Sequence, residues 1–137
     1  MSLFRLDERL ENDTLEVGVT GVCRLRLMND SRWPWLILVP MIGGASEMHD
    51  LPKQQQRQLT EEMLLCGAAL KRVTNCEKIN TAAIGNIVRQ LHVHVVARSA
   101  GDANWPGPVW GFGARMPYAD ASGLITKIRD ELGADIL

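Results

Sequence analysis

Residues 90–98 read Gln-Leu-His-Val-His-Val-Val-Ala-Arg, and the rest of the chain is best interpreted around this stretch. Apolar and polar residues alternate along most of this stretch, and a period of two is typical of a β-strand, whose side chains point alternately to opposite faces. One face carries Leu91, Val93, Val95 and Ala97, and the other carries Gln90, His92, His94 and Arg98, with Val96 among them. The stretch therefore predicts a strand with one core face and one face equipped to meet an anion.

His92 and His94 are two of the three histidines in the chain. An imidazole titrates at about pH 6.5, so each ring can act as a nucleophile, an acid or a base near neutral pH. Two other interpretations stay open: the histidines of an outer strand face can simply be solvated, and His-x-His on a strand places both rings where they could bind a metal ion. Zinc needs a third or fourth ligand, however, and the cysteines show no Cys-x-x-Cys spacing. We therefore expect neither a metal nor another cofactor.

The composition is that of an ordinary globular protein. The chain has 137 residues, 46% hydrophobic and 23% charged, so one domain with one core is expected. The net charge of −1 provides no general attraction to nucleic acid or to a membrane surface. The first residues lack the apolar region of a signal peptide, no apolar run approaches the roughly 18 residues of a membrane span, and the three cysteines follow no disulfide spacing. We expect a soluble, cytoplasmic protein that binds neither nucleic acid nor membranes.

The first part of the chain predicts a hairpin, a buried strand and a long helix. Residues 14–28 read as a hairpin that turns near Thr20-Gly21, and the apolar run 36–39, closed by Pro40, reads as a central strand buried on both faces. Asp50 is placed to cap a helix that has Pro52 in its first turn. Apolar residues at steps of four and three form one stripe along this helix: Leu59, Met63, Cys66, Leu70 and Val73. We expect the stripe to pack on the sheet.

The second part of the chain completes the sheet. Residues 79–84 predict a strand, which a turn at Gly85-Asn86 connects to an antiparallel histidine strand over residues 87–98. After a loop at residues 99–108, a final helix is predicted from Asp120 or Ser122 to Leu132, with Gly133 as the residue after its end. This order predicts an α+β fold: an antiparallel sheet of about five strands, one long helix packed on it and a C-terminal helix. We expect a single domain over residues 1–137, with its core in 14–100 and the C-terminal loop and helix in 101–137.

Residues 85–96 read Gly-Asn-Ile-Val-Arg-Gln-Leu-His-Val-His-Val-Val and resemble the signature of the histidine triad (HIT) superfamily, His-φ-His-φ-His-φ-φ, where φ is hydrophobic. The order of the upstream features is also similar: Asn29 before a turn, the strand ending at Pro40, the long helix and a strand opening near Asn80. The resemblance covers about residues 14–100 and implies a HIT-like fold. It also implies hydrolysis or transfer at the α-phosphorus of a nucleoside phosphoramidate or dinucleoside polyphosphate, through a nucleotidyl-histidine.

The resemblance implies a role for each matching residue. His92 is the expected nucleophile, and His94 is expected to contact the phosphoryl oxygens. The expected substrate-binding residues are Asn29, or else Asp30, at the ribose, Asn80 and Asn86 near the phosphates, and Trp105 at the edge of the substrate. Packing in the core or an interface is the alternative for Trp105, and a surface ion pair is the alternative to a phosphate role for Arg98. Family members are commonly two-fold dimers, so the resemblance also implies a homodimer that binds a small-molecule nucleotide.

Gln90 occupies the first triad position, where the family has a histidine. In the family the main-chain carbonyl of that residue orients the nucleophile, and Gln90 retains a carbonyl, so His92 is still expected to be poised. A glutamine side chain forms hydrogen bonds but delivers no proton at pH 7, so the leaving group must take its proton from His94, water or the substrate. Two hypotheses follow: an enzyme with Gln90, His92 and His94 as its catalytic residues, and a nucleotide-binding module without full activity.

Overall fold

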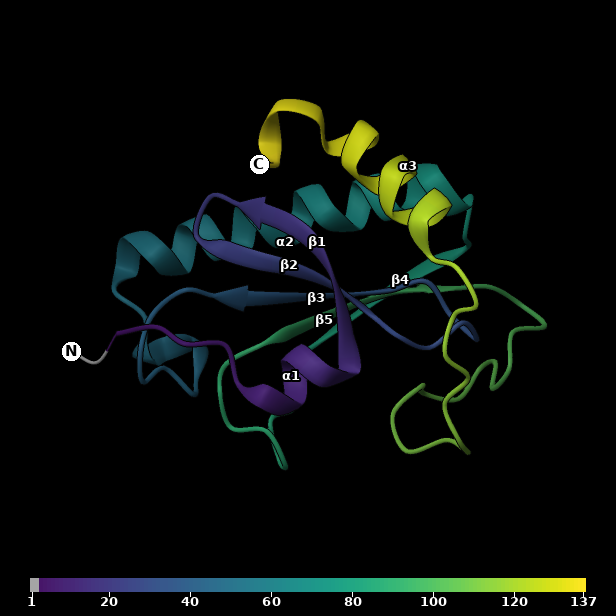
Figure 1. Ribbon diagram of the computed structural model, residues 1–137, viewed down its shortest axis with the longest axis horizontal. Helices are drawn as coiled ribbons and strands as arrows, with labels where there is room; N and C mark the ends of the chain where they lie inside the picture. Colours follow the sequence, from purple (N-terminus) through teal and green to yellow (C-terminus); the bar gives the residue numbers. More distant parts are fainter. Residues whose placement is uncertain (1–2) are drawn as a thin grey trace.

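Five antiparallel strands form one open sheet in the order β1-β2-β3-β5-β4 (Figure 1). The computed structural model describes residues 3–137, so the first two residues of the predicted domain lie outside the described part. The strands are β1 (Thr14–Thr20), β2 (Cys23–Met28), β3 (Trp35–Pro40), β4 (Lys78–Ala82) and β5 (Val93–Arg98). With the helices described below, they confirm the predicted α+β fold and its sheet of five strands.

The strand β3 lies in the middle of the sheet, as its apolar sequence predicts. All six of its residues are buried, because β3 pairs with β2 on one side and β5 on the other and both of its faces are covered. In the pairing with β5, Ile37 lies opposite His94. The predicted β1–β2 hairpin is also confirmed, and Gly21 occupies its turn with a φ of 68°, which residues with a side chain rarely adopt.

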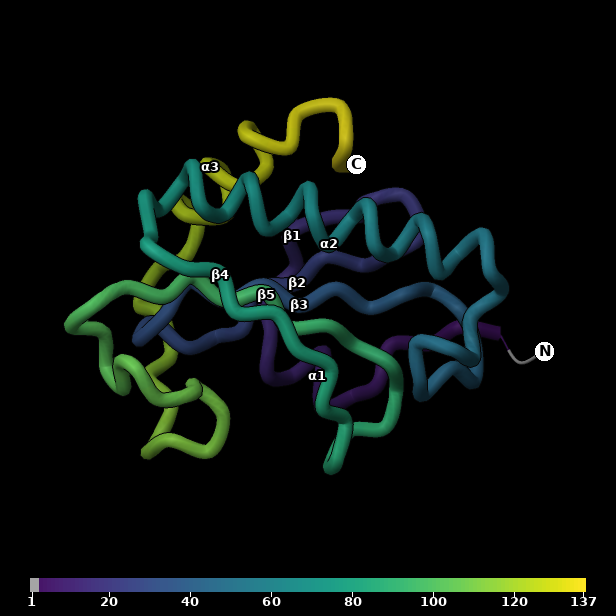
Figure 2. Tube along the Cα trace, turned by 180° about the vertical axis from the view of Figure 1, so that it is seen from behind, coloured from purple at the N-terminus to yellow at the C-terminus, as the bar shows by residue number. Residues whose placement is uncertain are grey.

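Helices α2 (Lys53–Thr74) and α3 (Ser122–Leu132) lie together over one face of the sheet (Figure 1 and Figure 2). The predicted stripe of α2 packs there, with Leu59 and Leu70 fully buried. The helix α3 has Gly133 at its end, as the sequence predicts. The larger hydrophobic core therefore lies between the sheet and these two helices.

The opposite face is covered by the helix α1 (Glu8–Asp13) and by the loop that follows β5 (Figure 2). A second, smaller apolar cluster lies there and consists of Leu6, Leu10, Trp33, Trp35, Ile37, Val39, Val96 and Val109. His92, His94 and Arg98 are also buried. The interpretation of the two histidines as solvated surface residues is therefore wrong.

The predicted tight turn before the histidine strand is also wrong. The strand β4 ends at Ala82 and β5 begins at Val93 rather than at residue 87, so residues 83–92 form a loop. The backbone near the end of this loop is bonded to another segment, because the N–H of Leu91 donates to the carbonyl of Ala45 at 3.0 Å. This loop, and not a hairpin turn, leads into β5 and carries Gln90 and His92.

Asp50 does not cap α2. Its carboxylate accepts hydrogen bonds from the N–H groups of Ser46 at 3.1 Å and Glu47 at 2.8 Å, which close the 3₁₀ turn η1 (Met48–Asp50). Pro52 instead occupies the N-cap position of α2. A second 3₁₀ turn, η2 (Gly133–Asp135), follows α3. None of the helices within residues 3–137 has both the length and the apolar character needed to cross a membrane.

Candidate active site

A cavity of about 330 Å³ lies beside the start of β5. It is lined by the loop 83–92, by both histidines and by the loop after β5, through Ile84, Gly85, Asn86, Ile87, Val88, His92, His94, Trp110 and Gly111. Across the described residues 3–137, no group of three or more His, Cys, Asp or Glu side chains is arranged to hold a metal ion. A largely apolar cavity with a few convergent polar groups is the usual form of a small-molecule site.

His92 lies directly before β5 and is 7% exposed. Its Nδ1 atom is 2.7 Å from the main-chain oxygen of Gln90. Because a carbonyl oxygen only accepts hydrogen bonds, Nδ1 carries the proton of the neutral ring and donates it to this bond. The other ring nitrogen, Nε2, is left with a lone pair. The main chain thus orients the imidazole of His92, and the Nε2 lone pair of its neutral form is left free of this hydrogen bond.

His94 lies on β5 and contacts three aromatic rings. The indole Nε1–H of Trp35 donates to its Nδ1 atom at 3.0 Å. The ring centroid of His94 lies 4.9 Å from the ring centroid of His92 and 5.3 Å from the ring centroid of Trp110, and both pairs have edge-to-face geometry. Burial and, secondly, the neighbouring His92 lower the pKa of His94 to about 3, so the ring is neutral near pH 7.

The side chain of Gln90 is directed to the N-terminal segment. Its Oε1 atom accepts a hydrogen bond from the N–H of Asp7 at 2.9 Å, and its Nε2 atom donates to the carbonyl of Arg5 at 2.7 Å. Arg9 donates from Nη1 to the carbonyl of Ile87 at 3.3 Å across the same junction. The amide of Gln90 therefore joins the N-terminal segment to the loop 83–92, while its main-chain oxygen contacts the ring of His92.

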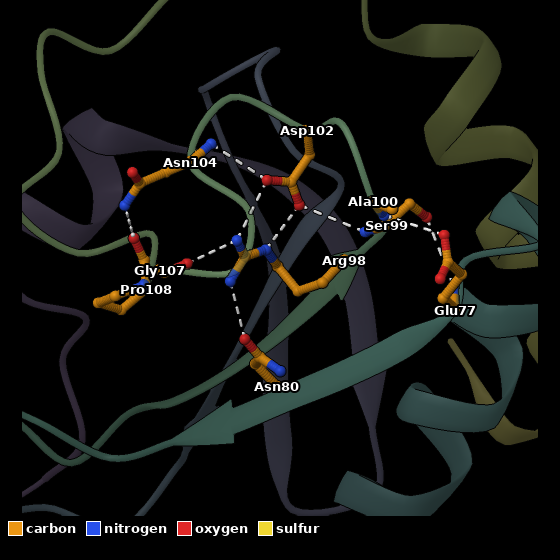
Figure 3. A network of polar contacts seen from close by, with 9 residues as sticks. All are labelled: Glu77, Asn80, Arg98, Ser99, Ala100, Asp102, Asn104, Gly107 and Pro108. Atoms are coloured by element: carbon orange, nitrogen blue, oxygen red, sulfur yellow. Dashed lines mark hydrogen bonds and ion pairs between the residues drawn. The ribbon is translucent and has the colours of Figure 1, made fainter.

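Of the residues predicted to bind the substrate, Asn86 borders the cavity. Asn29, Asn80 and Trp105 lie outside its lining. The Oδ1 atom of Asn29 accepts a hydrogen bond from the N–H of Tyr118 at 2.9 Å. The Oδ1 atom of Asn80 accepts one from Nη1 of Arg98, also at 2.9 Å (Figure 3). The ring of Trp105 has its centroid 5.8 Å from the guanidinium carbon of Arg98.

A second cavity, of about 240 Å³, adjoins the first. Gly111 borders both cavities, and Trp35, which bonds His94, forms part of the wall of the second. Asp30, which the family resemblance offers as the alternative to Asn29, borders this second cavity and forms an ion pair with Arg32 at 2.8 Å. Burial raises the pKa of Asp30, but the hydrogen bonds from Arg32 outweigh this effect and lower it.

Arg98 anchors the loop that follows β5 (Figure 3). Its guanidinium donates to the carboxylate of Asp102 from Nε at 2.8 Å and from Nη2 at 3.1 Å, and Nη2 also donates to the carbonyl of Gly107 at 2.7 Å. Arg98 is 1% exposed, so it is a buried anchor and not the surface ion-pair partner that the sequence suggested. The loop that it anchors leads to Trp110, which borders the first cavity.

Two tryptophans at the site were not among the predicted site residues. Trp35 shares a strand face with Ile37, which lies opposite His94, so the period of two together with the register between β3 and β5 places Trp35 near that histidine. The period is visible in the sequence, but the register is not. Trp110 lies in an irregular loop, where no periodic pattern indicates the direction of a side chain.

The comparisons with known proteins agree with one another. Residues 9–101 match the family model described as HIT domain. A solved histidine triad (HIT) protein from Sinorhizobium meliloti is 53% identical, with a TM-score of 0.92, and the match covers 94% of this chain and 97% of that chain. A histidine triad protein from Bradyrhizobium japonicum is 41% identical (TM-score 0.92, covering 95% of this chain and 98% of that chain). One from Marinobacter aquaeolei is 39% identical (TM-score 0.90, covering 98% and 97%).

No curated protein matched the chain. The residues that match the family model include the hairpin, the long helix and both histidines of the cavity. The three solved relatives extend the similarity over nearly the whole chain. The chain therefore belongs to the histidine triad (HIT) family, as the family model, these relatives and the paired histidines beside β5 together show.

Proposed function

We propose that this HIT protein binds a nucleotide and cleaves it at the α-phosphorus. The observation that carries the proposal is the buried ring of His92, which the Gln90 carbonyl orients at 2.7 Å beside a cavity of about 330 Å³. The family supplies the substrate class, which is nucleoside phosphoramidates and dinucleoside polyphosphates. In this proposal the phosphoryl group lies against His92, and the nucleoside extends into the adjoining cavity bordered by Asp30 and Trp35.

The proposed reaction consists of two displacements at phosphorus. In the first, the lone pair of His92 Nε2 forms a bond to the α-phosphorus, and the leaving group departs with the electron pair of its own bond; an amine leaving group takes up a proton from water. In the second, a water oxygen attacks the phosphorus, the bond to Nε2 breaks with its electron pair returning to Nε2, and the proton of the water passes to the solvent as the nucleoside monophosphate leaves. A transferase uses another acceptor in place of water. His94 and Asn86 donate hydrogen bonds to the phosphoryl oxygens, where negative charge develops.

The other predicted site residues have proposed roles away from the phosphorus. Asp30 is the better candidate for the ribose, because it borders the second cavity while the amide oxygen of Asn29 is bonded to Tyr118. Asn80 supports Arg98, whose loop leads to the cavity. Gln90 acts through its main-chain oxygen.

A covalent adduct tests the proposal. The protein is incubated with adenosine phosphoramidate and with dinucleoside polyphosphates, quenched in a non-acidic denaturant, and examined by mass spectrometry for a nucleotidyl group on His92. His92→Asn should abolish both the adduct and the release of nucleotide. His49→Asn is the matched control, because His49 lies in η1 with a side chain that is 84% exposed. Full turnover by His92→Asn would refute the proposal.

A second candidate function is nucleotide binding without catalysis. The observation that favours it is Gln90, whose amide is engaged with Arg5 and Asp7 and can deliver no proton. Calorimetry with the same nucleotides separates the two functions. Measurable binding with neither adduct nor product favours the binding module, and an adduct that turns over excludes it.

We also propose that two copies of the chain form a two-fold dimer through the edge strand β4. An edge strand presents backbone groups that can pair with another chain, and symmetric dimers are a common way to cover such an edge. Leu64 and Leu65 on the neighbouring helix α2 are 69% and 42% exposed, which adds apolar surface for an interface. Light scattering should give twice the mass of one chain, and a monomer at all concentrations would overturn this proposal.

A further inference from the structure

We propose that Trp35 is a positioning residue that holds His94 as the tautomer protonated on Nε2, so that His94 offers a hydrogen-bond donor to the phosphoryl group. The role of His94 at phosphorus rests on the proposed function. The tautomer rests only on the contact between the two rings, so that the two parts of the inference can be tested separately.

The contact between Trp35 and His94 has a single chemical interpretation. The indole Nε1 atom lies 3.0 Å from His94 Nδ1, and both residues are buried, at 6% and 5% exposure. An indole N–H only donates, so Nδ1 must present a lone pair to it. A neutral imidazole with a lone pair on Nδ1 carries its proton on Nε2.

The fold fixes the direction of the indole N–H before any ligand binds. Trp35 begins β3, and its backbone pairs with Val96. Its ring packs edge to face against Trp33, with centroids 6.3 Å apart, and against Trp110, with centroids 6.2 Å apart. A donor held in this way orients His94 without reorganisation during the reaction, which is the property that makes preorganised groups effective in catalysis.

The two histidines are consequently held as opposite tautomers. His92 donates from Nδ1 to the carbonyl of Gln90, whereas His94 accepts at Nδ1 from Trp35. The Nε2 atom of His92 therefore has a lone pair that can attack the phosphorus. The Nε2 atom of His94 carries a proton, and this N–H can stabilise a developing oxyanion. A second proton on His94 would lie on Nδ1, where its N–H would face the indole N–H of Trp35, so that two donors would oppose each other. Burial and the neighbouring His92 act in the same direction, since they lower the pKa of His94 to about 3.

Proton–nitrogen correlation spectra of protein with isotope-labelled histidine test the tautomer, because protonated and unprotonated ring nitrogens resonate far apart. At neutral pH we expect wild-type His94 to carry its proton on Nε2. Trp35→Phe keeps an aromatic ring but removes the N–H, and should shift His94 to a mixture of tautomers. Trp33→Phe is the matched control: Trp33 is a buried indole of the same cluster, and the hydrogen bond to His94 Nδ1 comes from Trp35 and not from Trp33.

Steady-state kinetics test the consequence for the reaction. Trp35→Phe should lower kcat about 10-fold with little change in KM, less than the loss of about 100-fold or more expected when His94→Phe removes the donor itself. A wild-type His94 protonated on Nδ1, or an unchanged tautomer in Trp35→Phe, would overturn the inference. The wild-type spectrum alone decides the tautomer where Trp35→Phe does not fold. If no adduct forms on His92 but the tautomer shifts as expected, the proposed function fails while the positioning by Trp35 stands.

Discussion

The main-chain oxygen of Gln90 lies 2.7 Å from His92 Nδ1, and the side chain of the same glutamine holds the N-terminal segment. The backbone of this residue therefore contacts the ring of His92, the proposed nucleophile, while its amide reaches Asp7, 83 positions away in the sequence. The first triad position thus couples the orientation of His92 to the docking of the N-terminus. Substitutions that keep the carbonyl and change the side chain separate these two roles.

Gln90→Ala removes the amide and keeps the carbonyl. We expect it to destabilise the fold by about 1–3 kcal/mol, because two hydrogen bonds worth roughly 1 kcal/mol each are lost and their partners are left without the amide. Amide hydrogen exchange at Asp7 should become faster, and kcat should fall less than in His92→Asn. Arg89→Ala, at an exposed neighbouring residue, is the control for stability. Unchanged exchange at Asp7 would show that the amide does not hold the N-terminal segment in solution.

Gln90→His restores an imidazole at the first triad position. An amine leaving group needs a proton, whereas a polyphosphate departs as a stable anion, so an added acid should assist the first more than the second. We expect the ratio of kcat/KM for adenosine phosphoramidate to that for a dinucleoside polyphosphate to rise in this variant. Parallel measurements on the wild type give the reference ratio. An equal change for both substrates would indicate that the proton comes from another source.

The lowered pKa of His94 makes the fold sensitive to acid. Burial and the neighbouring His92 bring this pKa to about 3, while the ring of the unfolded chain keeps its usual value of about 6.5. Between these values the unfolded state binds more protons, so this contribution to stability is complete above about pH 6.5 and is lost as the pH falls toward 3. The slope is at most about 1.4 kcal/mol per pH unit. Urea unfolding at several pH values from 7 to 4 gives the free energy of unfolding as a function of pH. Its dependence on pH should be shallower for His94→Phe than for the wild type, and an identical dependence would contradict the lowered pKa of His94.

The fold was predictable from the sequence because its elements bury apolar faces of regular period. The steps of four and three that include Leu59 and Leu70 correctly predicted the packing of α2, and the apolar run at residues 36–39 correctly predicted the central strand. The loop 83–92 was not predictable, since its conformation depends on distant partners. The N–H of Leu91 bonds to Ala45, and no local pattern contains that contact.

The site was predictable only where chemistry and spacing coincide. His92 and His94 are separated by one residue, and this spacing brings both rings to the same cavity. Trp35 reaches His94 from another strand, which requires the register between β3 and β5. The residue type of Asn80 suits a ligand, but only the structure shows that its amide oxygen accepts from Arg98.

Asp102→Asn should loosen the loop after β5. Burial raises the pKa of Asp102, but hydrogen bonds, those from Arg98 first, outweigh it and hold this pKa well below its usual range. The substitution keeps the shape of the side chain and leaves the buried guanidinium without a counter-charge, for which we expect a loss of about 3 kcal/mol. Urea unfolding measures the loss, and hydrogen exchange in residues 99–108 should become faster. Asp130→Asn, on the exposed side of α3, is the control. A loss no larger than that of the control would contradict a stabilising role for the pair.

Glu62→Gln should destabilise the fold without acting on the cavity. Glu62 is 1% exposed, and its carboxylate accepts hydrogen bonds from the hydroxyl of Thr20 at 2.8 Å and from the N–H groups of Val22 and Cys23, both at 3.1 Å. Glutamine has the same shape, but its NH₂ group only donates, so at least one of these donors loses its acceptor at a cost of about 1–3 kcal/mol. Glu61→Gln, at the exposed neighbouring position of the same helix, is the matched control. Because α2 covers the face of the sheet opposite the histidines, kcat of the folded protein should be the same in both variants, and equal unfolding free energies would show that the buried carboxylate is dispensable.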